Sequence, residues 1–234
     1  MAGSKMNPNR FSILIVFLLL AGQSMLTASE LKLTLQPESS IRLDGDGTIH
    51  SWSAQTRDIS GQWETTTNWL SISTSPVPHH CESHLTVSIQ AASLGSIDLT
   101  GKPTNNLEGR WIRHAIRDEK HPTIFFVMNR LTLTNALREP IPTWEFTVRG
   151  KLTLAGVTNL ISFPARLTHP EATQFKITGT TELKLKDFAI EPPLFQSAPN
   201  SNGNNYPHIT IFSNEVKLTF NLVFKPTGAQ MPGK

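Results

Sequence analysis

The residues best suited to chemistry form one compact group, His79, His80, Cys81 and His84. Imidazole and thiolate side chains bind zinc and copper, so the group suggests a metal site. Its spacing matches no standard zinc module, and the segment Trp69–Cys81 is rich in Ser, Thr and Pro, as is typical of a loop or an irregular insertion. The sequence therefore favours solvated loop histidines and no bound metal. A metal-dependent enzyme is the weaker alternative.

Nucleophilic and phosphate chemistry find little support in the sequence. The chain has no Gly-x-Ser-x-Gly elbow and no phosphate-cradling glycine loop, and Cys81 has no identifiable oxyanion partner. Asp44, Asp46 and Asp58 could act as paired carboxylates, but the turn chemistry of a hairpin explains the first two. We therefore expect a protein that is not an enzyme.

Residues 1–29 are typical of a secretory signal peptide. Lys5 and Arg10 precede the apolar run Phe11–Gly22, and small residues follow between Ser24 and Ser29. The apolar run is about a dozen residues long, whereas a spanning helix needs roughly 20, so an N-terminal anchor is the alternative. We expect a periplasmic or secreted protein, exported by a bacterium.

Residues 30–226 are predicted to form one domain, followed by a disordered tail at 227–234. The whole chain has 21 Lys and Arg and 18 Asp and Glu, and the signal segment holds two of the basic residues and no acidic one. The mature chain is therefore nearly neutral, with scattered basic residues, which argues against a nucleic-acid partner. A single cysteine excludes an internal disulfide, so an apolar core must provide the stability.

Three long strands near the C-terminus alternate apolar and polar residues, at Thr143–Leu154, Phe175–Leu185 and Glu215–Phe224. Side chains on a strand alternate faces, so each strand has one dry face. Such one-sided antiparallel strands bury their faces together either in a sandwich or in a closed barrel. The same pattern predicts further strands at Leu31–Gln36, Ile41–Gly45, Thr48–Gln55, Ile59–Thr65, His84–Gln90, Thr123–Thr134 and Thr158–Leu167.

One helix and one long loop interrupt the strands. Helical spacing of apolar residues predicts a helix over Asn106–Lys120, limited by Pro122. Asp187–Pro207 holds four prolines and an Asn-rich run, which predicts a loop at one mouth of a barrel. The fold class is therefore all-β, with one short helix.

Four patterns in order carry a family resemblance: Gly47–Trp52, Glu119–Phe126, Gly150–Thr158 and Asp187–Pro193. Together they resemble the YceI-like family of exported lipid-binding proteins. The resemblance implies a single antiparallel, lipocalin-like β-barrel that holds a long isoprenoid or quinone-like lipid and performs no catalysis. The family usually has Gly where Ala189 stands, so the turn there could differ.

The resemblance assigns the inward-facing residues to the wall of a lipid cavity. This set is Leu85, Val87, Ile89, Ile124, Phe126, Trp144, Phe146, Val148, Phe163, Phe175, Ile177, Leu183, Val216, Leu218, Phe220 and Leu222. Near the mouth, His50, His121 and Phe188 are candidates to contact a polar head group. The alternative is a non-catalytic β-sandwich interaction module with a filled core.

An apolar lipid is the expected partner, and the sequence leaves two further partners open. The helix residues Trp111, Arg113 and Arg117 could make transient contact with a membrane, although a helix that caps one barrel end is the simpler interpretation. A homodimer is the other.

Overall fold

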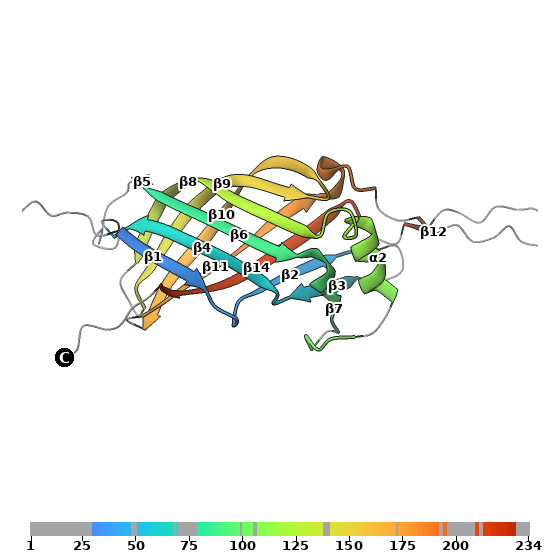
Figure 1. Cartoon of the computed structure of the whole chain (residues 1–234), viewed down its shortest axis with the longest axis horizontal. Helices are drawn as coiled ribbons and strands as arrows, with labels where there is room; N and C mark the ends of the chain where they lie inside the picture. The colour runs from blue at the N-terminus through green and yellow to red at the C-terminus, as the bar shows by residue number, and fades with distance from the viewer. Residues whose placement is uncertain are drawn as a thin grey trace, which may run out of the picture.

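Eight strands form a closed antiparallel barrel in the computed structural model (Figure 1). In hydrogen-bonded order around the ring they are β1 (Glu30–Leu35), β4 (Ile59–Thr66), β6 (Ser83–Gln90), β8 (Thr123–Leu137), β9 (Thr143–Leu154), β10 (Val157–Glu171), β11 (Gln174–Lys184) and β14 (Glu215–Pro226), which returns to β1. The prediction of a single antiparallel barrel is confirmed, and the sandwich alternative is wrong.

The structure describes residues 30–47, 51–67, 69, 79–98, 100–104, 107–137, 141–171, 173–191, 194–195, 209–210 and 213–227. The predicted signal peptide, His50, the tail from residue 228 and most of the predicted loop Asp187–Pro207 lie outside these residues. Within them, no helix is long and apolar enough to cross a bilayer.

Shorter strands extend the barrel wall. β2 (Ser40–Gly45) pairs with β14, β3 (Trp52–Thr56) pairs with β2, and β7 (Gly95–Ser96) pairs with β3. β5 (His79–Cys81) adds to β8, and β12 (Leu194–Phe195) pairs separately with β13 (Ile209–Thr210). The predicted hairpin at Asp44–Gly47 is thus present as β2 and β3.

One edge of β14 pairs with β11, and its other edge pairs with two strands in succession. Its first half pairs with β2, from Val216 to Asn221, and its last residues, from Phe224 to Pro226, pair with β1. Between the two ladders, the Ser39 hydroxyl accepts a hydrogen bond from the Val223 amide at 3.0 Å and donates to the Val223 carbonyl at 3.4 Å. Ser39 is buried, so its side chain replaces the strand partner that is missing where β1 gives way to β2.

Two glycines in the barrel wall leave room for aromatic rings from neighbouring strands. A Cβ atom on Gly150 would overlap the ring of Phe126, and one on Gly179 would overlap the ring of Phe220. Both glycines face inward on strands whose other inward residues are large. The ring edges of Phe126 and Phe220 therefore take the space where a side chain at each glycine would lie.

The helix α2 (Leu107–Ala115) ends earlier than the sequence predicts, so the predicted end at Lys120 is wrong. Arg117 has a positive φ of 56°, which stops the helix. Its guanidinium donates hydrogen bonds to the carbonyls of Ala155, at 3.1 Å, and Ala189, at 3.4 Å. Ala155 and Ala189 also have positive φ. The Arg117 side chain therefore links the three described non-glycine residues in the left-handed conformation, at the α2 end of the barrel.

Two other segments differ from expectation. His79–Cys81 is a strand, not a loop, because it pairs with Leu131–Leu133 of β8. The start of the predicted loop at Asp187 belongs to the 3₁₀ helix η3 (Leu185–Phe188), which begins where β11 ends. Ala189, where the family usually has Gly, adopts the left-handed conformation directly after η3.

We expect Ser39→Ala to lower the free energy of unfolding by about 1–3 kcal/mol, because it removes the partner of the Val223 amide. The Val223 carbonyl keeps the hydrogen bond from the Gln36 amide, at 2.8 Å. Urea unfolding of the variant measures the loss. Ser40→Ala, one residue further, serves as the control and should change stability by about 0.5 kcal/mol or less. Equal stability of both variants would contradict the role assigned to Ser39.

Candidate ligand cavity

An apolar cavity of about 90 Å³ lies inside the barrel. Many of the residues predicted to face inward line it: Leu85, Val87, Ile89, Phe126, Phe146, Val148, Phe163, Ile177, Leu218, Phe220 and Leu222. The sequence analysis did not assign the remaining lining residues, which are Ile41, Trp63, Met128, Leu131, Leu152, Ile161, Ala165, Leu167 and Thr181. Among the described lining residues, only Thr181 and the indole of Trp63 carry a polar side-chain group. The wall is thus almost wholly hydrocarbon.

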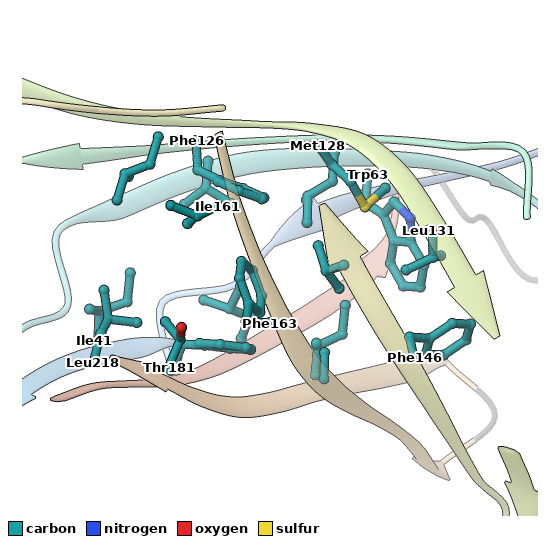
Figure 2. Close-up of a pocket in the computed structure, with 18 of the residues that line it drawn as sticks. Ile41, Trp63, Phe126, Met128, Leu131, Phe146, Ile161, Phe163, Thr181 and Leu218 are labelled. Carbon is teal, nitrogen blue, oxygen red and sulfur yellow. The ribbon is translucent and has the colours of Figure 1, made fainter. Parts of the chain in front are cut away.

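Three touching aromatic rings cross the cavity. The ring centroids of Phe126 and Phe163 lie 5.6 Å apart, and those of Phe163 and Phe220 lie 5.3 Å apart. Figure 2 shows Phe163 near the middle of the group, with Trp63 and Phe146 to one side of it and Thr181 to the other. Phe163 is only half-buried, whereas the other two rings are buried.

A second apolar cavity of about 80 Å³ adjoins the first at the end covered by α2. It accounts for three more predicted residues, Ile124, Leu183 and Val216. Ile112 and Ile116, from the helix and the turn after it, close this cavity from outside the ring. Ile41, Ile89, Leu152 and Leu218 line both cavities, so the two spaces share a wall within one barrel.

Two predicted residues, Trp144 and Phe175, line neither cavity. They belong to an aromatic plug near β5, which lies at the opposite end of the barrel from α2 (Figure 1). Trp69 is fully buried there and contacts the Trp144 ring edge-on, with centroids 5.8 Å apart. Trp63 stacks on Trp69 at 6.1 Å and meets Phe175 edge-on at 6.2 Å. The Trp69 segment was predicted to be irregular; the one signal of burial was the large indole within a Ser- and Thr-rich stretch.

Two of the residues predicted to contact a head group, His121 and Phe188, are described, and both pack near the end of α2. Phe188 is 1% exposed and packs in the core, and so does not line an open mouth. The His121 ring covers Gly156, where an added Cβ atom would lie 2.8 Å from Nε2. His121 therefore packs against the β9–β10 turn, and the three family-like motifs in the described residues meet at this end.

The histidine and cysteine group is not gathered into a metal site. Cys81 is buried, while the exposed His80 places its Nδ1 atom 3.2 Å from the carbonyl oxygen of Leu131. His84 is exposed on β6. No cluster of three or more His, Cys, Asp or Glu side chains suited to a metal occurs in the described part of the chain. Burial raises the pKa of the Cys81 thiol to about 11, against a smaller opposing effect of a backbone hydrogen bond from Leu133.

These features define a class of protein: a closed, eight-stranded, lipocalin-like barrel with an apolar interior. The chain belongs to the YceI-like family, because residues 34–224 match the YceI-like domain. This match confirms the resemblance drawn from the four sequence patterns. No curated protein matches the sequence.

Two solved structures share the fold. A polyisoprenoid-binding domain from Saccharophagus degradans, implicated in plant cell wall breakdown, aligns with a TM-score of 0.56 and 14% identity over 84% of this chain and 99% of that one. BcnA from Burkholderia cenocepacia aligns with a TM-score of 0.53 and 14% identity over 81% of this chain and 98% of that one.

We expect the Cys81 thiol to react very slowly with a soluble disulfide reagent at pH 7.5 in the folded protein. With a pKa of about 11 the thiolate is scarce at this pH, and burial restricts access. Full reaction should appear only after urea unfolding. Rapid reaction of the folded protein would show that β5 does not stay docked on β8.

We expect Gly156→Ala to destabilise the barrel by about 2–5 kcal/mol, since it adds both the strain of a positive φ and an overlap with the His121 ring. Gly101→Ala is the matched control, because Gly101 has the same φ of 82° but open space around it. It should cost only about 1–2 kcal/mol in urea unfolding. Equal losses of stability in the two variants would mean that the His121 ring moves aside without cost.

Proposed function

We propose that this protein is an exported carrier or store for a lipid with a long apolar tail, of the isoprenoid or quinone-like class. The observation that carries the proposal is the apolar interior of a closed barrel, whose described wall offers no charged group. Membership of the YceI-like family supports it, as does the shared fold with a domain named for polyisoprenoid binding. Export, periplasmic or secreted, follows from the signal-like N-terminus and is part of the proposal.

The physics of the wall favours a chain over a compact polar ligand. A hydrocarbon chain needs no polar recognition along its length, and burying it gains roughly 25 cal/mol per Å² of apolar surface. A polar ligand would lose its hydrogen bonds to water without replacing them. Because the wall has no acid, base or nucleophile aimed at the space, the proposed role is binding without chemistry.

The size of the cavity implies movement on binding. Drug-sized ligands occupy pockets of roughly 300 Å³ or more, and a cavity of roughly 150 Å³ admits a single benzene ring. The spaces of about 90 and 80 Å³ are smaller than either, so a long chain must displace side chains. Phe163 is suited to move, because it is half-buried and stands between the Phe126 and Phe220 rings.

Native mass spectrometry of the gently purified protein tests the proposal. The expected result is a co-purified lipid mass that solvent extraction removes and that an added polyprenyl alcohol restores. A protein that is free of lipid and takes up no offered polyprenyl alcohol or isoprenoid quinone would overturn it.

We expect Phe163→Glu to weaken uptake of a polyprenyl alcohol by about 100-fold or more, because the carboxylate would have to lose its water beside an apolar chain. Ser60→Glu is the control, since Ser60 is exposed on the outer face of β4. The control should retain wild-type uptake in a fluorescence titration. Unchanged uptake by a folded Phe163→Glu protein would place the ligand elsewhere.

A further inference from the structure

The wall of the barrel separates between β10 and β11. The two strands pair from Glu171 and Gln174 up to Ala165 and Gly179, where the ladder stops. Beyond that point β10 still pairs with β9 down to Val157, and β11 still pairs with β14 up to Lys184. Each strand thus continues with one partner and leaves the edge that faces the other strand unpaired.

Two other interruptions of the ring are filled by added strands. Where β6 leaves β8, β5 pairs with Leu131–Leu133 of β8. Where β1 leaves β14, β2 takes its place. No strand among the described residues fills the space between β10 and β11. Unpaired backbone N–H and C=O groups must meet water or another chain, so water has access to the backbone along this seam.

The 3₁₀ helix η3 frames the seam at the α2 end. It begins directly after β11 and turns toward β10, where the side-chain amide of Asn159 donates a hydrogen bond to the Asp187 carbonyl. The seam is therefore bounded by Val157–Pro164 of β10, by Thr180–Lys184 of β11 and by η3. Both strands stay paired with their other neighbours along the seam, so the ladder is interrupted here between ordered strands.

The lining residues with the greatest exposure lie along this side of the cavity. Five lining residues are only half-buried, and all come from β10, β11 and β14: Ile161, Phe163, Ile177, Thr181 and Leu218. Those from β4, β6, β8 and β9 are buried. Figure 2 shows Ile161, Phe163 and Thr181 around the space itself, so the most exposed part of the cavity wall adjoins the unpaired strand edges.

One large apolar side chain is exposed on the outer surface at the seam, and two more lie on β8, beyond β9. Leu160, on the unpaired part of β10, is 58% exposed. It shares a row across the sheet with Lys151 and with Val127, which is 37% exposed, and Phe125 in the next row is 48% exposed. An apolar chain leaving a lipid surface would find contacts outside the barrel before it enters.

We infer that the seam between β10 and β11 is the entrance through which the apolar chain passes into the cavity, and this inference rests on the proposed function. The chain passes sideways through the wall, beside Leu160 and past Phe163, instead of over either barrel end. Among the described residues, α2 lines the cavity at one end and the touching rings of Trp63, Trp69 and Trp144 occupy the other. The ligand class is a single narrow lipid chain, such as an isoprenoid tail, since a bulky body would not pass between two strands of an intact barrel.

Cross-linking the seam tests the entrance. Continuing the register of Ala165 with Gly179 sets Ser162 opposite Glu182, and both are exposed. Ser162→Cys/Glu182→Cys is bridged with a short bismaleimide after folding, and the native thiol does not interfere because Cys81 is buried. The matched control, Thr168→Cys/Lys176→Cys, is bridged where the same two strands are paired. The probe is a fluorescently labelled geranylgeraniol, followed by stopped-flow fluorescence.

The expected result is a kinetic block without loss of the site. Association and dissociation of the probe slow by the same factor, about tenfold or more, and the dissociation constant is unchanged. The bridged control, and the test variant labelled with a monofunctional maleimide of small size, keep wild-type rates. Wild-type rates in the bridged test variant overturn the entrance, as does a weakened equilibrium affinity at an unchanged association rate. A wild-type protein that takes up no probe overturns the proposed function and the entrance with it.

Discussion

Closure of the ring through β14 is the constraint on which the rest of the structure depends. A twelve-residue strand closes against a six-residue one, so three of its positions pair with β1 and the others need a second partner. β2 supplies that partner, and β3 and β7 then extend from it. The Ser39 hydroxyl joins the two ladders at Val223. At the α2 end, residues of β2, β3 and α2 join those of the ring in lining the second cavity.

Glycine placement decides how much of the interior stays empty. The rings of Phe126 and Phe220 lie over Gly150 and Gly179, where any larger residue would push them inward. Phe163 is then the aromatic side chain that reaches between them. A barrel of eight strands is normally just wide enough for its own side chains to fill. Here two glycines free a volume that the side chains leave unoccupied, so small residues on the wall contribute as much to the binding space as the apolar ones.

Local alternation predicted the strands and the inward faces well, because period-two patterning depends only on neighbouring residues. Predictions from the local pattern failed where contacts between distant residues determine the structure. The helix ends at Ala115, and Arg117 just beyond it bonds to Ala155 and Ala189, 38 and 72 positions away. Leu131 was missed because β8 shifts register between Met128 and Arg130, which exchanges the inward and outward positions beyond that point. The closed ring and the parted seam arise from pairing between strands, and a single sequence carries no direct record of pairing.

The contact between β1 and β14 also sets an order of events during synthesis. Thr34 and Thr227 hydrogen-bond through their side chains although 193 positions separate them, so the ring cannot close until the chain has been made as far as β14. Until then β1 has only β4 as a neighbour, and its other edge stays open. Pairing over such separations forms slowly because a long loop must first be closed. The growing chain therefore passes through a stage as an open, curled sheet, and this is when it most needs protection from edge-to-edge association.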